Sequence, residues 1–203
     1  MKIICIGRNY IDHAKEMKSP VPKKPVFFMK PETALLTKNR PFYYPPFSKE
    51  IHYEVELVFK ITRNGKHIRK EFADSYYKEV GLGIDFTARD LQRECKEKGL
   101  PWEIAKAFTD SAPVSEIFPV TKLKDKDNIH FHLEKNGKIV QQGVSSDMIF
   151  NMEDIISYVS QFVMLRMGDL VFTGTPVGVG PVKIGDSLVG FIEDKEMFNF
   201  EVK

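Results

Sequence analysis

The clearest hydrophobic pattern in the chain is a strict alternation between His52 and Ile61. In the stretch HYEVELVFKI every second residue from Tyr53 onward is apolar, which is typical of a strand with one face in a core. The opposite face carries two carboxylates, Glu54 and Glu56, side by side. A core explains the apolar face, whereas the acidic face taken alone favours an ordinary solvated sheet surface.

Shorter apolar runs predict further strands, most of them bounded by turn residues. These runs are residues 3–6, 25–31, 33–36, 80–86, 129–135, 138–144, 170–174 and 187–192. Two Asn-Gly pairs predict hairpins, because this dipeptide suits the tight turn between antiparallel strands. The pair at 64–65 would join the alternating strand to the short run 66–68, and the pair at 136–137 would join the runs on either side of it.

Three segments have the composition and spacing of helices. They are residues 9–17, residues 87–99, which end at a glycine suited to a helix terminus, and residues 152–164. Strands predominate, so the predicted fold class is α+β and β-rich, with a mostly antiparallel sheet. We expect one structural domain in which residues 1–48 form a strand and a mobile arm, laid over a main body of residues 49–203.

Length and composition exclude several classes of structure and function for this chain. A chain of 203 residues fits one domain, and 30 basic against 28 acidic residues give no reason to expect nucleic acid or an anionic membrane as a partner. No run of 18 apolar residues predicts a membrane span, and the first residues lack the apolar core of a signal peptide. Cys5 and Cys95 stand apart, which favours reduced thiols in a cytoplasmic protein.

A third carboxylate changes the interpretation of the acidic face. Residues i and i+2 of a strand point the same way, with Cα atoms roughly 6.5–7 Å apart, so Glu54 and Glu56 can converge on one cation. Asp85 ends an apolar run just before a predicted helix, where it would be either a helix cap or a further ligand. Three carboxylates without cysteine or a histidine pair suit Mg²⁺, Mn²⁺ or Ca²⁺ better than Zn²⁺.

Two other groups are candidates for chemistry. His13 and Glu16 are three residues apart on a predicted helix, so the carboxylate can orient the imidazole as a general base. The same spacing also occurs on plain surface helices. Lys106 lies in an apolar, aromatic stretch, where it would either face an anionic substrate or extend its ammonium group to solvent.

The glycine-rich segment 172–181 is not a phosphate loop, because it lacks the required lysine and opens onto no predicted helix. Its plain interpretation is a tight turn after a strand. Its functional interpretation is a set of backbone N–H groups that bind a carboxylate together with Thr175.

Taken together, these motifs resemble the fumarylacetoacetate hydrolase family, and in particular its small acylpyruvase and oxaloacetate-acting branch. The resemblance is carried by GRNYIDHAKEM at 7–17, HYEVEL at 52–57, the segment 84–115, SSDMIF at 145–150 and the segment 168–186. It implies a catalytic domain built on a rolled mixed β-sheet, assembled as a homodimer.

The resemblance also implies a role for each candidate residue. Glu54, Glu56 and Asp85 match the family's ligands for Mg²⁺ or Mn²⁺, and His13 and Glu16 match its acid–base pair on an N-terminal lid. Lys106 matches the family's active-site lysine, and Thr175 matches its threonine near the substrate carboxylate. Arg8 and Gln92 match further residues that contact the substrate.

These residues suit a small 2-oxo acid whose enolate is stabilised by a Lewis-acidic metal. Hydrolysis of an acylpyruvate, decarboxylation of oxaloacetate and keto–enol tautomerisation of oxaloacetate all pass through such an enolate, and the sequence does not rank them. Two alternatives stay open. One is an isomerase or hydratase of longer 2-oxo diacids in aromatic catabolism, and the other is a non-catalytic metal- or ligand-binding protein.

Overall fold

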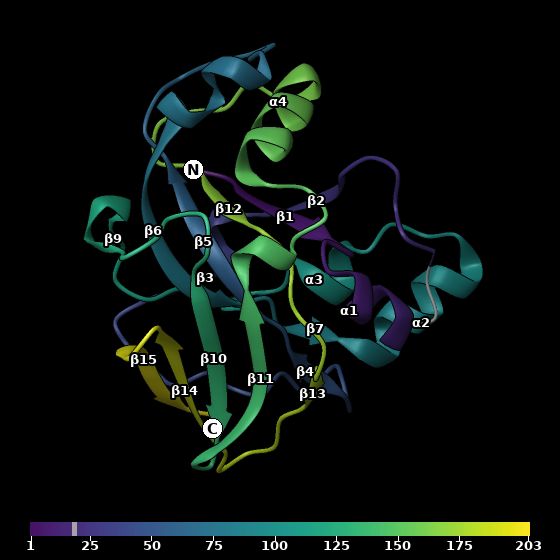
Figure 1. Cartoon of the computed structure of the whole chain (residues 1–203). Coiled ribbons are helices and arrows are strands. Elements are labelled where there is room, and N and C mark those ends of the chain that lie inside the picture. Colours follow the sequence, from purple (N-terminus) through teal and green to yellow (C-terminus); the bar gives the residue numbers. More distant parts are fainter. Residues whose placement is uncertain (18–19) are drawn as a thin grey trace.

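A six-stranded sheet forms the centre of the structure, a computed structural model that describes residues 1–17 and 20–203 (Figure 1). Residues 18 and 19, which belong to the predicted arm, lie outside the described part. The strand order is β2 (Val26–Lys30), β1 (Ile3–Gly7), β12 (Leu170–Phe172), β5 (Val55–Ile61), β6 (Tyr77–Ile84) and β9 (Phe118–Pro119). Only the β1–β12 pair is parallel within this sheet.

In the described part of the chain, three smaller sheets and four α-helices complete the fold. The sheets are β11 (Lys138–Val144), β10 (His130–Lys135), β14 (Ser187–Ile192) and β15 (Lys195–Glu201); β13 (Gly180–Pro181), β4 (Ile51–Tyr53) and β7 (Thr87–Ala88); and β3 (Leu35–Leu36) with β8 (Ala112–Pro113). The helices are α1 (Ile11–Glu16), α2 (Arg89–Lys98), α3 (Glu103–Lys106) and α4 (Met152–Phe162), with 3-10 segments η1 (Glu32–Ala34), η2 (Lys70–Tyr76), η3 (Val120–Lys122) and η4 (Ser145–Asp147). The predicted strand-rich α+β class is confirmed.

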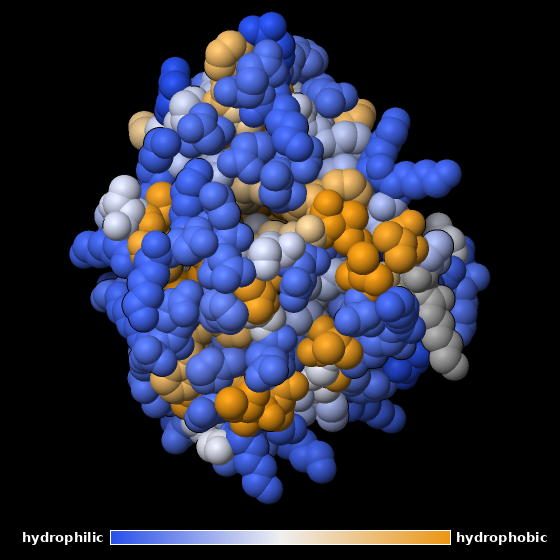
Figure 2. Space-filling model, in the orientation of Figure 1, coloured by the Kyte–Doolittle hydropathy of each residue, from blue (hydrophilic) through white to orange (hydrophobic). Residues whose placement is uncertain are grey.

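Both faces of the six-stranded sheet are buried. On one face Leu57 and Leu82 belong to a large core that also contains Phe131 and Leu188 of the four-stranded sheet and Ile156 of α4. On the other face a second core is formed by the residues Ile3, Cys5, Ala34, Val58, Ala112, Val114, Leu170 and Phe172. The face of the molecule shown in Figure 2 is mostly hydrophilic, with apolar side chains in small groups.

The predicted strand 52–61 differs from the structure in two ways. It is interrupted at Glu54, so that β4 and β5 pair in different sheets. Its acidic face is not solvated, because Glu56 lies next to Val58, which packs in the second core, and both glutamates are buried. The alternation was correctly identified, but the solvated acidic face that this segment favours when taken alone is not found.

One predicted hairpin is confirmed and the other is wrong. Residues 136–137 form the two-residue turn between β10 and β11, with the positive φ angles of 53° and 74° that such a turn requires. Residues 64–65 do not join two strands. Instead β5 pairs with β6, and Gly65 forms an isolated bridge with Leu165.

The helices follow their sequence signals closely. Helix α2 ends at Gly99, whose φ of 65° is the left-handed conformation expected at a helix terminus.

Cys5 and Cys95 are both buried free thiols. Within residues 1–17 and 20–203, none of the helices combines the length and apolar composition of a membrane span.

The glycines of β6 allow another segment to approach the sheet at the level of the carboxylates. Gly83 lies opposite Glu56, and a Cβ built there would be 2.8 Å from Pro113 O and 2.8 Å from the Val58 side chain. Contacts this short do not occur without displacement of a neighbour. The absence of a side chain at this position therefore lets residues 113–115 pack against β6.

We predict that Gly83→Ala lowers the free energy of unfolding by about 1–3 kcal/mol, because the methyl group meets backbone and core atoms that cannot move aside freely. Chemical denaturation followed by circular dichroism measures this change. Gly7→Ala is the matched control, since a Cβ at Gly7 meets only Val26 O at 3.8 Å. Equal stability of the Gly83→Ala variant and the native protein would show that the close packing is absent.

Candidate active site

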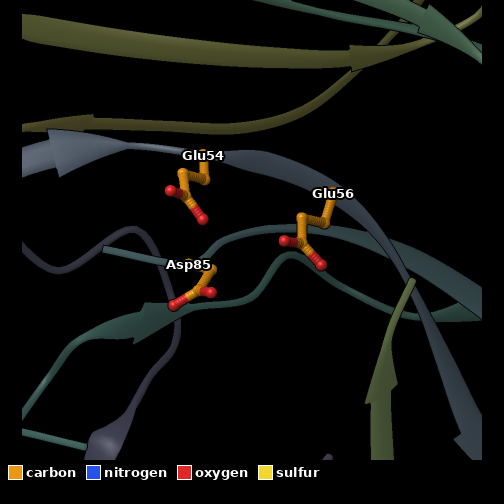
Figure 3. A group of neighbouring side chains, drawn as sticks. All are labelled: Glu54, Glu56 and Asp85. Atoms are coloured by element: carbon orange, nitrogen blue, oxygen red, sulfur yellow. The ribbon is translucent and has the colours of Figure 1, made fainter. Parts of the chain in front are cut away.

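The register of β5 against β6 brings three carboxylates together (Figure 3). Val55 pairs with Ile84, and the Asp85 N–H donates a 2.8 Å hydrogen bond to Glu54 O, so the break before β5 lies opposite the end of β6. Glu54, Glu56 and Asp85 each offer an oxygen within 4.8 Å of the others. Their exposed fractions are only 6%, 2% and 1%.

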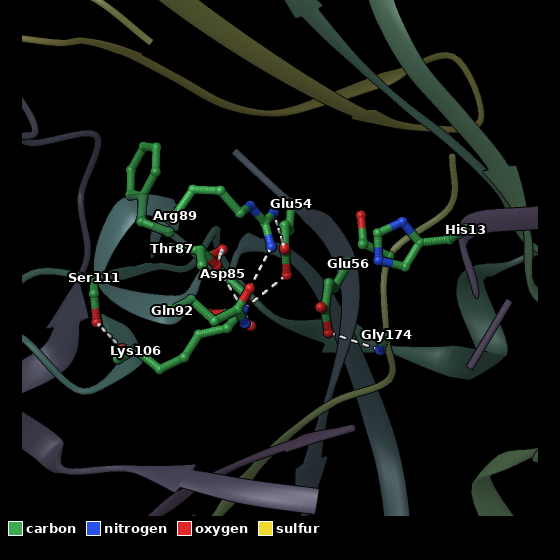
Figure 4. A network of polar contacts seen from close by, with 12 residues as sticks. His13, Glu54, Glu56, Asp85, Thr87, Arg89, Gln92, Lys106, Ser111 and Gly174 are labelled. Atoms are coloured by element: carbon green, nitrogen blue, oxygen red, sulfur yellow. Dashed lines mark hydrogen bonds and ion pairs between the residues drawn. The ribbon is translucent and has the colours of Figure 1, made fainter. Parts of the chain in front are cut away.

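Buried cations compensate this negative charge (Figure 4). Lys106 Nζ donates to Glu54 Oε2 at 2.8 Å and to Asp85 Oδ2 at 2.6 Å. Arg89 donates to Glu54 Oε1 at 2.5 Å. The Lys30 ammonium lies 2.6 Å from Asp85 Oδ1, in an ion pair without hydrogen-bond alignment. Glu54 and Asp85 therefore have cationic partners, whereas Glu56 does not belong to an ion pair with any described residue.

The pKa values reflect this unequal distribution of cations. Burial alone would raise the pKa of Glu54, but the charges of Lys106 and Arg89 lower it below its ordinary value. Burial raises the pKa of Glu56, and the neighbouring charges of Asp85 and Glu54 raise it further, against one hydrogen bond from the Gly174 N–H at 2.7 Å. Glu56 is thus the carboxylate with the greatest unmet need for a cation.

The donor set fits a divalent cation. Asp85 Oδ1 is buried and is paired with Lys30 without an aligned hydrogen bond, and Glu56 Oε1 receives no hydrogen bond from residues 1–17 and 20–203. Oxygen ligands from carboxylates are the ones that Mg²⁺ and Mn²⁺ prefer. A cation bound by Glu54, Glu56 and Asp85 would relieve the repulsion that raises the pKa of Glu56.

Helix α1 brings the predicted base to the same place. His13 is buried, and its Nδ1 lies 3.1 Å from Glu16 Oε2, as the three-residue spacing predicts. The other oxygen of Glu16 accepts a 3.1 Å hydrogen bond from Gly178 N, which joins α1 to the glycine-rich turn. The start of the helix is anchored by buried Asn9, whose side-chain amide donates to Thr173 O at 2.8 Å. In Figure 4 the His13 ring extends from α1 toward the carboxylates.

A cavity of about 420 Å³ joins these groups. Of the residues predicted for the site, the cavity is lined by Arg8, His13, Glu54, Glu56, Asp85, Gln92, Lys106 and Thr175. Glu16 is not among its lining residues and contacts His13 from outside. The structure therefore brings together residues that are up to 167 positions apart, and no predicted site residue lies elsewhere.

Sequence reasoning missed three cations at the site: Arg89 and Lys96, which line the cavity, and Lys30, which pairs with Asp85. Arg89 lines the cavity, pairs with Glu54 and donates to Gln92 Oε1 at 2.7 Å. The spacing of residues 89 and 92 on a predicted helix was a usable signal, since residues three apart share a helix face. Lys30 is fully buried behind Asp85 and donates to Ser111 O at 2.7 Å. Its only signal was a lysine at the end of an apolar run.

Gln141 was also missed, although it connects two parts of the site. Its Oε1 accepts a 2.9 Å hydrogen bond from Val55 N, the residue between the two glutamates. Its Nε2 donates to Thr175 Oγ1 and to Pro176 O, both at 2.9 Å. Gln141 thus positions the interrupted strand relative to the glycine-rich turn. Nothing in the alternating segment of β11 distinguishes this glutamine from its neighbour.

Comparison with known proteins identifies relatives along the whole chain. Residues 2–203 match the model for the C-terminal domain of fumarylacetoacetate (FAA) hydrolase. The mitochondrial oxaloacetate tautomerase of Mus musculus is 45% identical over 99% of this chain and 91% of its own length. An oxaloacetate tautomerase of Escherichia coli (strain K12) is 42% identical over 92% of this chain and 86% of its own length.

Among solved structures, the fumarylpyruvate hydrolase of Pseudomonas aeruginosa in complex with Mn²⁺ and pyruvate superposes with a TM-score of 0.94. It is 37% identical, and the match covers 100% of this chain and 89% of the other.

We predict that Glu56→Gln raises the unfolding temperature of the metal-free protein by about 2–4 °C, equivalent to about 1 kcal/mol for a chain of this size. Because its pKa is raised on folding, Glu56 holds a proton that the unfolded chain has lost, so stability falls as the pH rises from the ordinary carboxyl pKa to the raised one. The amide removes this loss, and its oxygen can still accept from Gly174 N.

Thermal unfolding in EDTA between pH 6 and 8 measures this difference, which should grow with pH. Added Mn²⁺ should raise the unfolding temperature of the native protein but not that of the variant. A variant that is less stable than the native protein in EDTA would contradict the assigned repulsion.

Proposed function

The chain belongs to the fumarylacetoacetate hydrolase family and is an enzyme, and on that premise we propose that it interconverts the keto and enol forms of oxaloacetate with a divalent cation, Mg²⁺ or Mn²⁺. Two relatives that match most of the chain are named oxaloacetate tautomerases. The neighbour that binds Mn²⁺ and pyruvate supports both the metal and the 2-oxo acid class of substrate.

One observation carries the proposal: a single cavity is lined by the carboxylate triad, by His13 and by Lys106. A protein that only binds a metal or ligand needs no buried histidine oriented by a carboxylate. The combination of cation ligands, a base and a buried ammonium group is instead what proton transfer next to a carbonyl requires.

Tautomerisation moves one proton between C3 and the C2 oxygen of oxaloacetate. His13 is the group that would take the proton from C3, because Glu16 holds its Nδ1 and leaves Nε2 for the substrate. The Glu16 carboxylate also stabilises the imidazolium that forms. Lys106 keeps its positive charge, since burial lowers its pKa less than Asp85 and Glu54 raise it, and it stabilises negative charge that develops on the substrate.

The substrate carboxylate next to the carbonyl would lie near Thr175 and the backbone N–H groups of its turn. A divalent cation held by Glu54, Glu56 and Asp85 would supply Lewis-acid stabilisation of the substrate oxygens. Arg8 and Gln92 line the same cavity and are proposed as further substrate contacts.

Acylpyruvate hydrolysis is a second candidate function. It is favoured by the structural similarity to a fumarylpyruvate hydrolase and by the His13–Glu16 pair, which can equally activate a water molecule. The two reactions differ in what they consume, because hydrolysis requires water at the distal carbonyl and breaks a C–C bond. A comparison of oxaloacetate and acetylpyruvate turnover by the same preparation ranks them.

We predict that Asp85→Ala abolishes Mg²⁺-dependent keto–enol interconversion, because it removes one of three ligands and leaves Lys106 and Lys30 without their shared acid. The interconversion is followed by the ultraviolet absorbance of the enol form. EDTA should have the same effect on the native enzyme. Glu94→Ala, which removes an exposed carboxylate of α2, is the control with unchanged activity. Turnover that survives both EDTA and Asp85→Ala would refute the metal assignment.

We predict that His13→Ala lowers kcat for tautomerisation and for acylpyruvate hydrolysis by about 10²-fold or more, the usual contribution of a general base. Decarboxylation should decrease less, since loss of CO₂ needs no proton abstraction. The affinity for Mn²⁺, measured by calorimetry, should not change, because His13 is not one of the three ligands. An unchanged tautomerisation rate would mean that another group moves the C3 proton.

A further inference from the structure

Lys96 is a charge at the cavity that the proposed proton transfer does not use. It lies on α2 and is exposed to solvent, yet it lines the same cavity as the carboxylate triad. Its ammonium nitrogen is 5.4 Å from the centre of the Trp102 ring, within the range of a cation–π interaction. The side chain is therefore held at the exposed edge of the cavity by an aromatic surface.

A second lysine lies over a second aromatic ring in the buried part of the same cavity wall. Trp102 packs edge-to-face on Phe28, with the ring centres 6.2 Å apart. The buried Lys106 lies over Phe28, with Nζ 5.1 Å from the ring centre. Each ring of this aromatic pair therefore contacts one lysine. Lys106 lies over Phe28 beside the carboxylates, and Lys96 lies over Trp102 near solvent.

The two lysines differ in their partners. Lys106 is neutralised by Glu54 and Asp85. Within residues 1–17 and 20–203, neither Lys96 nor Arg8 forms a hydrogen bond or an ion pair with a carboxylate. Partial burial lowers the pKa of Lys96, and the nearby charge of Arg89 lowers it further, so the group lies among other cations. An anion at this edge would relieve that repulsion.

The charges of the cavity favour a substrate with two negative groups. Four cationic side chains and three carboxylates line it, and a divalent cation would add two further positive charges. One substrate carboxylate is expected near Thr175, on the turn after β12. Lys96 comes from a separate part of the fold, helix α2, which leaves it available for a second anionic group.

We propose that Lys96 binds the distal carboxylate of the substrate and so selects 2-oxo diacids over 2-oxo monoacids. This inference rests on the proposed function and specifies the substrate class of the same site. Lys96 acts as a specificity-determining residue, which stabilises the bound substrate without taking part in proton transfer.

Two substrates isolate this contact. Oxaloacetate and 2-oxobutanoate differ only in that a methyl group replaces the distal carboxylate, and both can exchange C3 hydrogen for deuterium. Exchange in D₂O with the Mg²⁺-loaded enzyme, followed by proton NMR, gives KM and kcat for each. We expect Lys96→Met to raise KM for oxaloacetate about tenfold, the loss of one charge-assisted contact. The kcat values and the KM for 2-oxobutanoate should stay within about twofold.

Lys98→Met is the matched control, because it removes the same charge from the same helix at a side chain that is 61% exposed and paired with Glu94 at 2.6 Å. It should change neither KM, and Lys96→Arg should retain most of the affinity for oxaloacetate. Equal effects of Lys96→Met on both substrates would overturn the proposal. So would an oxaloacetate-selective loss in Arg8→Met but not in Lys96→Met.

Trp102 is the only tryptophan of the chain and reports binding independently of turnover. If the native enzyme exchanged C3 hydrogen of neither compound, the proposed reaction would fail, but titration of Trp102 fluorescence would still test the contact. Oxaloacetate should then bind more tightly than 2-oxobutanoate to the native protein, and Lys96→Met should remove that difference. Equal affinities of the native protein for both compounds would overturn the distal-carboxylate site.

Discussion

Three carboxylates buried within 4.8 Å of one another are the constraint on which the rest of this structure depends. Removing ionised groups from water is costly unless each is paired. Glu54 and Asp85 meet that requirement through Lys106, Arg89 and Lys30. Among the described residues, the third carboxylate, Glu56, has a single backbone N–H for a partner, and burial together with its acidic neighbours raises its pKa. Without a bound cation, the repulsion between these carboxylates lowers the stability of the folded protein. A cation bound between them would remove that repulsion.

The fold surrounds this cluster with segments from distant parts of the chain. The interruption of the strand at Glu54 turns its backbone toward the end of β6, and Gln141 holds the interruption against the glycine-rich turn. Glu16 links that turn to helix α1, and Asn9 fixes the start of the helix to the end of β12. These hydrogen bonds join His13, the three carboxylates and the glycine-rich turn into one connected network, so the loss of any one of them would loosen the position of the proposed site residues.

The sequence revealed those parts of the site that depend on local geometry. Alternation in a strand was enough to place Glu54 and Glu56 on one face, and helical spacing was enough to pair His13 with Glu16. The approach of Glu54 and Glu56 to Asp85 depends on the register between β5 and β6. The Asn-Gly pair at 64–65 predicted that β5 pairs with residues 66–68, whereas it pairs with β6. Burial of the acidic face was missed for a related reason, because the second core is assembled from segments remote in sequence. The lid role of residues 1–48, the homodimer and the individual residue roles stay predictions.

The central claim is that one divalent cation lies between Glu54, Glu56 and Asp85 during catalysis. Anomalous diffraction from crystals grown with Mn²⁺ tests this claim directly, because the signal locates the ion without reference to activity. We predict one strong peak per chain, within coordination distance of an oxygen from each of the three carboxylates, and its loss in crystals of the Asp85→Ala variant. A well-ordered, Mn²⁺-saturated crystal without a peak at this position would contradict the account.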